Sequence, residues 1–364
     1  MMIKKYSLLL AALSLAACKQ SKTEKSEDKP AETNAIAEVF ADFETEPVIE
    51  ASDEDAADDP AFWFNAKDAE KSLILGSNKK LGLEVYSMQG QRIAHYASGR
   101  INNIDVIQGF NWGDTVVDIV AGSNRSYGRI DVWAIDSSGT NFQLVSDTNM
   151  RSELEDVYGF CLYHDTLNKK VYAFINSKTG EVEQWEISAK DSSNQFSLGF
   201  KKMRLLNAGK QVEGMVVDPS SQKLYVGVEE EGILVFSAQA EDSLASTRIP
   251  LSGEDNPDLK FDIEGLAIHH SAAGKYLLAS SQGNNRYAIF NLEEDAKYVK
   301  AFAVVDSVVD GCEETDGIDA ISIKVGNKYP QGFMLIQDGY NFDNGEAKAQ
   351  NFKLVDWQKV AEIL

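Results

Sequence analysis

Acidic residues recur along the chain in short polar segments that separate runs of apolar residues. Five of them stand at comparable places in this pattern: Asp58, Glu213, Glu229, Glu264 and Asp316. Segments of the same kind carry basic residues at Lys79, Lys80, Arg125 and Lys178. Carboxylate oxygens are the ligands that hard divalent cations prefer, whereas Lys and Arg bind phosphate. If the segments meet, they predict a site where metal ions promote hydrolysis of a phosphate ester by water.

The composition agrees with oxygen ligands and argues against several other kinds of site. The chain has 364 residues, of which 57 are acidic and 35 basic, and its formal net charge is −22. This excess of acid argues against nucleic acid as a partner, because binding its phosphates requires a dense Lys and Arg surface. The sequence has no His-x-x-His or Cys-x-x-Cys pair of the kind found in zinc sites. It also lacks the Gly-x-Ser-x-Gly motif of α/β-hydrolases.

Alternating runs rich in β-branched and aromatic residues predict that the regular elements are strands. Six such runs begin about 50 residues apart, a spacing typical of propeller blades. They are Ser72–Gly76, Thr115–Ala121, Lys170–Ile175, Lys223–Val228, Lys275–Ala279 and Gly332–Ile336. After a short polar loop, each is followed by a second run: Leu83–Tyr86, Ile130–Ile135, Val182–Ile187, Ile233–Phe236, Tyr287–Phe290 and Phe352–Val355.

These pairs predict an all-β fold, a six-bladed β-propeller. No long helical period lies between them, as a parallel α/β sheet would require, and a pair of sandwiches would not produce six equivalent loops. Little chain remains after Trp357 for the outer strand of the last blade. We therefore expect the segment 36–48 to supply that strand.

The propeller predicts which loops share one end of the ring. In each blade, the loop that enters the innermost strand lies at the same end as the loop between the second and third strands. The five acids and four basic residues occupy these two classes of loop. Any one of them could be an ordinary solvated residue, but five acids at equivalent positions would repel one another without a counter-ion. A cage of several carboxylates favours Ca²⁺ over Mg²⁺, because Ca²⁺ accepts roughly 6–8 oxygen ligands.

The N-terminal residues have the features of an export signal. Lys4 and Lys5 precede the apolar run Leu8–Leu13, and the segment Leu15-Ala-Ala-Cys18 is similar to a lipoprotein cleavage box. An ordinary secretory signal with a chance cysteine is the alternative. We expect a lipoprotein signal peptide over residues 1–17, lipidation of Cys18, a flexible charged linker over 18–35 and the propeller over 36–364. The chain would then be an exported periplasmic or cell-surface lipoprotein that touches a membrane only through its anchor.

Several stretches resemble the β-propeller phytases, the calcium-dependent bacterial 3-phytases of the Bacillus type. They are Asp55–Trp63, Asn102–Asp105, Tyr158–His164, Asp262–Leu266, Leu277–Asn285, Thr315–Asp319 and Gln350–Leu354. The resemblance extends over about residues 44–363 and implies a six-bladed propeller. It also implies that the substrate is phytate (myo-inositol hexakisphosphate) or a lower inositol phosphate, and that calcium is the cofactor. We expect the protein to be a monomer.

The resemblance further implies roles for individual residues. Active-site calcium would be held by Asp58, Glu213, Glu229, Glu264 and Asp316. Phosphate would be contacted by Lys79, Lys80, Arg125, Tyr158 and Lys178. Structural calcium would be held by Asp59, Asp310, Gly311 and Asp338. The sequence departs from the family pattern at Ile107, Thr179 and Tyr340, where arginine, glutamate and an acidic residue are usual.

Two other functions are compatible with parts of this pattern. The missing acids at Thr179 and Tyr340 would suit a non-catalytic propeller that binds a phosphorylated ligand with the help of calcium. A calcium-dependent lactonase or esterase would favour a pair of histidines in the site. His269 and His270 are adjacent in a predicted strand and therefore point to opposite faces. Cys161 and Cys312 are expected to be packing cysteines, one in a buried strand and one in a loop.

Overall fold

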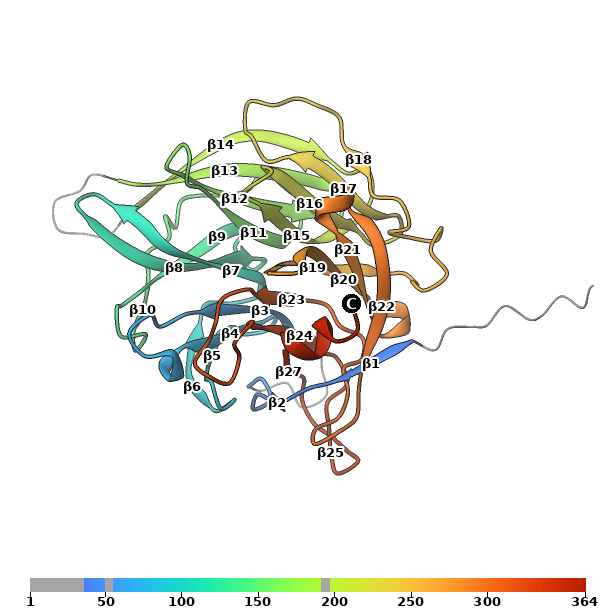
Figure 1. The fold of residues 1–364 in the computed structure, drawn as a ribbon. Helices are drawn as coiled ribbons and strands as arrows, with labels where there is room; N and C mark the ends of the chain where they lie inside the picture. Colours follow the sequence, from blue (N-terminus) through green and yellow to red (C-terminus); the bar gives the residue numbers. More distant parts are fainter. Residues whose placement is uncertain (1–35, 50–54, 191–196) are drawn as a thin grey trace, which may run out of the picture. The chain divides into compact units, whose positions relative to one another are not determined.

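The regular elements of the protein are almost all β-strands. The computed structural model describes residues 36–49, 55–190 and 197–364. In these residues the strands form six sheets of four or five strands and one separate hairpin (Figure 1). The innermost strands of consecutive sheets contact one another, and the last contacts the first, so that the sheets form a closed ring. The predicted all-β fold and six-bladed β-propeller are therefore confirmed.

The first four blades each consist of four consecutive strands, which run in order from the inner to the outer strand. Blade 1 contains β3 (Ala57–Trp63), β4 (Leu73–Asn78), β5 (Gly82–Ser87) and β6 (Arg92–Ala97). Blade 2 contains β7 (Ile101–Trp112), β8 (Thr115–Asn124), β9 (Arg129–Ile135) and β10 (Phe142–Leu144). Blade 3 contains β11 (Val157–Asp165), β12 (Lys170–Ser177), β13 (Glu181–Ala189) and β14 (Leu198–Asn207). Blade 4 contains β15 (Val212–Asp218), β16 (Lys223–Val228), β17 (Gly232–Ser237) and β18 (Thr247–Arg248).

The last two blades include strands from the beginning of the described chain. Blade 5 contains β19 (Ile263–Ser271), β20 (Gly274–Ser281), β21 (Arg286–Asn291) and β22 (Lys297–Val305), with β1 (Ala37–Phe40) at its outer edge. Blade 6 contains β23 (Ile318–Ile321), β24 (Phe333–Asp338), β27 (Asn351–Asp356) and β2 (Phe43–Glu44). The hairpin of β25 (Phe342–Asp343) and β26 (Glu346–Ala347) lies between β24 and β27 in the sequence, and helix α1 (Trp357–Ala361) follows β27. Short 3₁₀ turns occur at Ala69–Lys71, Gln282–Asn284 and Leu292–Glu294.

Each pair of apolar runs predicted from the sequence forms the second and third strands of one blade. In blade 3, the runs 170–175 and 182–187 lie in β12 and β13, which are antiparallel neighbours. Most residues of both strands are buried, because the neighbouring blades cover the two faces of the sheet. This double coverage explains why these strands are visible in the sequence as nearly continuous apolar runs.

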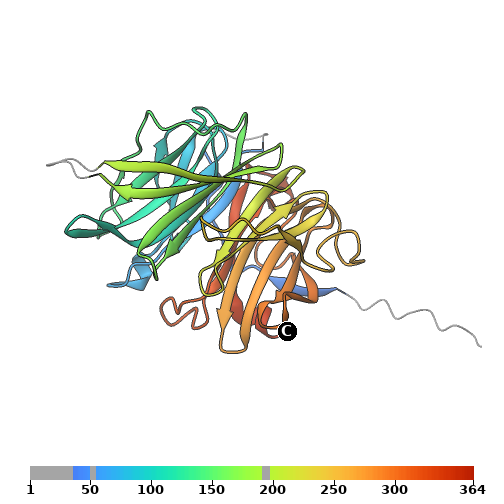
Figure 2. The same ribbon diagram turned by 90° about the horizontal axis from the view of Figure 1, so that it is seen from above.

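The N-terminal segment joins the last two blades and completes the ring. β2 pairs with β27 through Phe43 and Leu354, which confirms that the segment 36–48 supplies the outer strand of the last blade. β1 pairs in parallel with β22, beginning at Ala37 and Phe302, a second role that the sequence did not predict. The blue N-terminal strands lie beside the orange and red C-terminal strands in both views (Figures 1 and 2).

The hydrophobic core is divided among the contacts between neighbouring blades. Six clusters of buried residues are found in the described chain, and each combines side chains from two adjacent blades. Trp133 of blade 2 packs with Leu75 of blade 1, and Trp357 of α1 packs in the cluster between blades 5 and 6. Each blade thus depends on its neighbours for burial, which fixes the relative positions of the inner strands.

Both cysteines of the described residues are buried and free. Cys161 lies in β11 and Cys312 lies between β22 and β23, which confirms their prediction as packing cysteines. No helix of the described segments is long and apolar enough to span a lipid bilayer. The predicted signal peptide, Cys18 and the linker lie outside the described residues, so these remain predictions.

Candidate active site

Five inner strands share a β-bulge at the same end of the ring. In blade 1 the pairing of β3 with β4 shifts between Ala57 and Pro60, so that Asp58 and Asp59 face one residue, Ser77. Equivalent shifts occur between residues 101 and 104, 157 and 160, 212 and 215, and 263 and 266. A bulge interrupts the regular alternation of side chains and can direct a residue toward a site. The bulges place five residues at equivalent positions: Asp58, Asn102, Tyr158, Glu213 and Glu264.

We call this end of the ring, where the inner strands begin and the second strands end, the mouth. The sequence had predicted these residues in the loops that enter the inner strands, but they lie inside the strands themselves. Asp316, the sixth member, lies just before β23. The second-to-third turns at the same end contain Lys79, Lys80, Arg125, Lys178 and Glu229, as expected. Every predicted active-site residue is therefore located at the mouth.

Glycine follows the mouth residue in four blades, and its lack of a side chain brings neighbouring inner strands together. A Cβ atom on Gly159 would overlap the carbonyl oxygen of Glu213, and one on Gly214 would overlap the carbonyl oxygen of Glu264. The same relationship holds for Gly265 and the oxygen of Asp316. These close approaches explain why acid-glycine pairs recur in the sequence, and they bring the acidic side chains of adjacent blades near one another.

Three buried glutamates form the most compact group of acids at the mouth. Oxygen atoms of Glu213, Glu229 and Glu264 lie within 4.8 Å of one another. Burial raises the pKa of all three carboxyls, and the charges of Glu213 and Glu229 raise that of Glu264 further. Oε2 of Glu264 is buried without a hydrogen-bond partner among the described residues. An unpartnered carboxylate oxygen within a group of acids fits a divalent cation, which would relieve both burial and repulsion.

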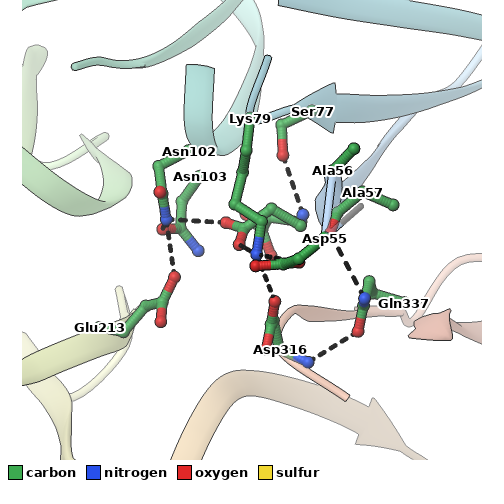
Figure 3. Close-up of polar contacts among 12 residues, drawn as sticks. Asp55, Ala56, Ala57, Ser77, Lys79, Asn102, Asn103, Glu213, Asp316 and Gln337 are labelled. Atoms are coloured by element: carbon green, nitrogen blue, oxygen red, sulfur yellow. Dashed lines mark hydrogen bonds and ion pairs between the residues drawn. The ribbon is translucent and has the colours of Figure 1, made fainter. Parts of the chain in front are cut away.

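The other two predicted ligands of active-site calcium, Asp58 and Asp316, lie on either side of a lysine. Nζ of Lys79 lies 2.6 Å from Oδ2 of Asp316 and 2.7 Å from Oδ1 of Asp55 (Figure 3). It also lies 3.0 Å from Oδ1 of Asp58. Burial raises the pKa of Asp58 to about 7 and that of Asp316 to about 7, although Lys79 opposes the change. Burial alone would lower the pKa of Lys79, but its three acidic neighbours raise it well above the usual value. Lys79 is thus a fixed positive charge in this part of the mouth.

Two further cations lie against the ring of Tyr158. The guanidinium carbon of Arg125 is 5.1 Å from the ring centroid, and Nζ of Lys178 is 4.3 Å from it. Arg125 also donates to Oδ1 of Asn102 at 3.1 Å and to Asp156 at 3.4 Å. Lys80, in the turn after β4, is exposed. The mouth therefore combines acidic residues with an aromatic ring that carries two cations, an arrangement suited to an anion bound beside metal ions.

The residues predicted to hold structural calcium fall into two places. Asp59 lines a cavity of about 190 Å³ and accepts a hydrogen bond from the backbone of Ile104 at 3.0 Å. Asp310, Gly311 and Asp338 instead converge on the ammonium group of Lys353. Oδ2 of Asp338 and the carbonyl oxygen of Gly311 each lie 2.7 Å from this group. These three residues thus already have a cationic partner within the protein, and calcium binding there remains a prediction.

Several residues that contact the site were not assigned a role from the sequence. Asp55 pairs with Lys79, Gln282 donates to Oδ1 of Asp316 at 2.7 Å, and Asn102 contacts Asp58 and Glu213. All three residues belong to stretches that resemble the phytases. These motifs could have identified the residues as members of the site. They could not have predicted the hydrogen-bond partners of the amides, because those depend on how the blades pack.

Comparisons with known proteins show the family to which the chain belongs. The family model for phytase matches residues 4–364. The 3-phytase of Bacillus subtilis (strain 168) is 41% identical over 332 residues, which cover 90% of this chain and 85% of that protein. The crystal structure of BBS1N in complex with ARL6DN, soaked with lead, has 11% identity and a TM-score of 0.47, over 81% of this chain and 77% of that one. The match over nearly the full length and the identity to a 3-phytase show that the chain belongs to the phytase family.

Proposed function

We propose that the protein is a calcium-dependent 3-phytase that hydrolyses phosphate monoesters of phytate and lower inositol phosphates. The observation that carries this proposal is the mouth, where the carboxylates of several blades meet the cations held by Tyr158. The proposal is also supported by the similarity of the chain to the B. subtilis protein, which is named a 3-phytase. The reaction releases inorganic phosphate, and water is the nucleophile.

The acidic residues would hold the metal ions. Glu213, Glu229 and Glu264 offer carboxylate oxygens close enough to share one ion, and Asp58 and Asp316 lie in neighbouring inner segments of the ring. Ligands that consist of several carboxylates and no histidine favour Ca²⁺. The chemistry that Ca²⁺ supplies when bound is neutralisation of the charge on the phosphate and activation of water.

The cations would bind and orient the substrate. Arg125 offers a planar fork of donors that suits a phosphate, and Lys178 adds a second positive charge on the same aromatic ring. The ring of Tyr158 limits the directions that both side chains can take. The side chain of Lys79 is 10% exposed and already pairs with three carboxylates. If Lys79 also contacts phosphate, its positive charge is divided between the phosphate and these carboxylates.

The two adjacent histidines lie outside the mouth. His269 stacks on Trp357 with 3.5 Å between the ring centroids, and its Nε2 bonds to the carbonyl oxygen of Gln331. His270 is adjacent to it in β19, as predicted. Because neither lies with the acids and cations of the mouth, the geometry favours phosphate hydrolysis over the lactonase or esterase alternative.

One assay tests the proposed function and its alternative. We expect release of inorganic phosphate from phytate in the presence of calcium, and loss of this release with EDTA or in Glu213→Ala. Glu186→Ala is the control, because Glu186 makes a partly exposed ion pair with Lys170 away from the mouth. Binding of phytate without turnover by the wild-type protein would instead indicate the non-catalytic calcium-dependent propeller.

We also propose that the mature protein is an exported lipoprotein anchored through Cys18, and that it is a monomer. The support is the sequence Leu15-Ala-Ala-Cys18 after an apolar run. Labelling with a radioactive fatty acid should mark the wild-type chain and not Cys18→Ala. Sedimentation of the chain without its first 35 residues should give the mass of a single copy; a larger mass would exclude the monomer.

A further inference from the structure

Asn102 connects three candidate residues that belong to different parts of the mouth. It lies in the bulge of β7 and is 0% exposed. Its Nδ2 donates to Oε1 of Glu213 at 2.7 Å (Figure 3). The same nitrogen donates to Oδ2 of Asp58 at 2.8 Å. Its Oδ1 accepts from Nη1 of Arg125 at 3.1 Å. One buried amide therefore contacts a carboxylate from blade 1, a carboxylate from blade 4 and a guanidinium from blade 2.

An amide satisfies these three partners in a way that other side chains cannot. Its NH₂ group donates to two carboxylates, while its oxygen accepts from a cation. An acid at this position would place a third negative charge beside Asp58 and Glu213. An apolar residue would leave their oxygens without a donor on this side. The remaining contact of Nδ2, to Oδ1 of Asn103 at 3.0 Å, joins the same network.

Arg125 depends on Asn102 for part of its orientation. Besides Asn102, its guanidinium contacts Asp156, at 3.4 Å, and the ring of Tyr158. The contact with Oδ1 of Asn102 is shorter than that with Asp156, and Asn102 is buried whereas the side chain of Asp156 is 50% exposed. A buried partner defines a direction more strictly than an exposed one, because it has fewer rotamers available.

We propose that Asn102 is a positioning residue that fixes Asp58 and Glu213 relative to each other and directs Arg125 toward the phosphate. It acts through these residues and, being fully buried, does not touch the substrate. The inference rests on the proposed function, since it assigns the carboxylates to the cation and the guanidinium to the phosphate.

Two substitutions separate the two halves of this role. Asn102→Asp keeps the size of the side chain and the oxygen that accepts from Arg125, but it loses the donors to the carboxylates. We expect kcat to fall about 10- to 100-fold, the range for loss of a residue that orients metal ligands, with KM within about threefold of the wild type. Asn102→Ala loses both contacts, so kcat should fall similarly and KM should rise by more than about threefold.

Asn65→Ala is the matched control. Asn65 is also a buried asparagine, at 6% exposure, and its Oδ1 accepts from the backbone of Lys67 and Asp68 in the loop after β3, at the other end of that strand. Its loss should lower the melting temperature but leave kcat and KM unchanged. If both Asn102 variants matched Asn65→Ala in kcat and KM, Asn102 would be a structural residue only and the proposal would be overturned.

Calcium titration by calorimetry provides a readout that does not depend on turnover. We expect Asn102→Ala to bind calcium about 10-fold more weakly than both the wild type and Asn65→Ala. If the wild-type protein releases no phosphate from phytate, the proposed function fails. The calcium titration alone then decides whether Asn102 is a positioning residue. Weaker calcium binding in Asn102→Ala would then still support positioning of Asp58 and Glu213, and equal titrations of the two alanine variants would overturn it.

Discussion

The ammonium group of Lys353 lies 2.7 Å from Oδ2 of Asp338, and both side chains are 0% exposed. The two residues lie at the mouth end of the third and second strands of blade 6. In blades 1 and 2, equivalent positions hold Glu84 beside Asn78, and Asp131 beside Asn124. The same polar connection between two strands thus occurs in the blade that closes the ring with donor and acceptor exchanged, because there the second strand carries the acid and the third strand the donor.

Substitution of Lys353 should strongly destabilise the protein. In Lys353→Met, the buried carboxylate of Asp338 and the partly buried carboxylate of Asp310 lose their cation, and breaking a buried pair such as that with Asp338 costs about 3–5 kcal/mol. Urea denaturation should show this loss in the free energy of unfolding. Lys297→Met is the control, because its pair with Glu294 is 69% and 54% exposed, and it should change stability by less than about 1 kcal/mol. Equal effects of the two substitutions would contradict the structural role of Lys353.

Removal of metal ions should lower the melting temperature. An ion bound only by the folded state stabilises it, and the acids at the mouth repel one another without such an ion. We expect a lower melting temperature in EDTA, recovery on addition of excess calcium, and a smaller calcium effect in Glu213→Ala. Identical melting curves with calcium and with EDTA would show that no bound metal contributes to stability.

The stability of the calcium-free protein should fall as the pH rises. Burial raises the pKa of Asp58 and Asp316 from 3.8 to about 7, so that between these values the folded state holds protons that the unfolded state has released. Stability therefore decreases as the pH rises through this interval and levels off above about pH 7. Calcium requires the ionised carboxylates, so its effect on the melting temperature should increase over the same interval. Melting curves with and without calcium test both trends; a calcium effect that does not vary with pH would contradict them.

Replacement of Arg125 by lysine should weaken substrate capture. Lysine keeps the charge but loses the planar fork and the contact of Nη1 with Asn102. We expect KM for phytate to rise by about 10-fold, which corresponds to one lost charged hydrogen bond, with a smaller change in kcat. Arg248→Lys is the control, because its pair with Asp255 is partly exposed and lies in blade 4. An unchanged KM in Arg125→Lys would remove Arg125 from the substrate contacts.

A methyl group on Gly214 should separate two inner strands. Because it would overlap the carbonyl oxygen of Glu264, Gly214→Ala must push β15 away from β19, which costs about 1–3 kcal/mol. Glu213 and Glu264 would also move apart, so calcium should bind more weakly. Gly199→Ala is the control, since its new atom would meet only side chains, the nearest at 3.1 Å. Thermal melting and calorimetry measure both effects; normal calcium affinity in Gly214→Ala would show that the close approach does not position the acids.

The fold was predictable because its repeating unit is local in sequence. The second and third strands of each blade are short apolar runs joined by a polar turn, so six of them reveal six blades. β1 was not predictable, because its four residues pair in parallel with β22, far away in the sequence, and nothing in their composition specifies that partner. The position of β2 could be inferred only because the ring needed a closing strand.

The sequence could predict which residues gather at the mouth, but not the hydrogen bonds and ion pairs between them. Acids and cations at equivalent turns were enough to place Asp58 and Arg125 at one end of the ring. The bulges that bring them together arise from register, which depends on packing between strands. The partners of Lys353 and Asn102 likewise depend on which blades become neighbours.

The pairing of β2 with β27 has a consequence for biosynthesis. Phe43 and Glu44 are synthesised long before their partners Leu354 and Lys353. Such distant pairing makes folding slow, because a long loop must close before the contact forms. During synthesis β2 must therefore stay unpaired until β27 has been made, and a protein that lacked either strand would leave blade 6 without this pairing.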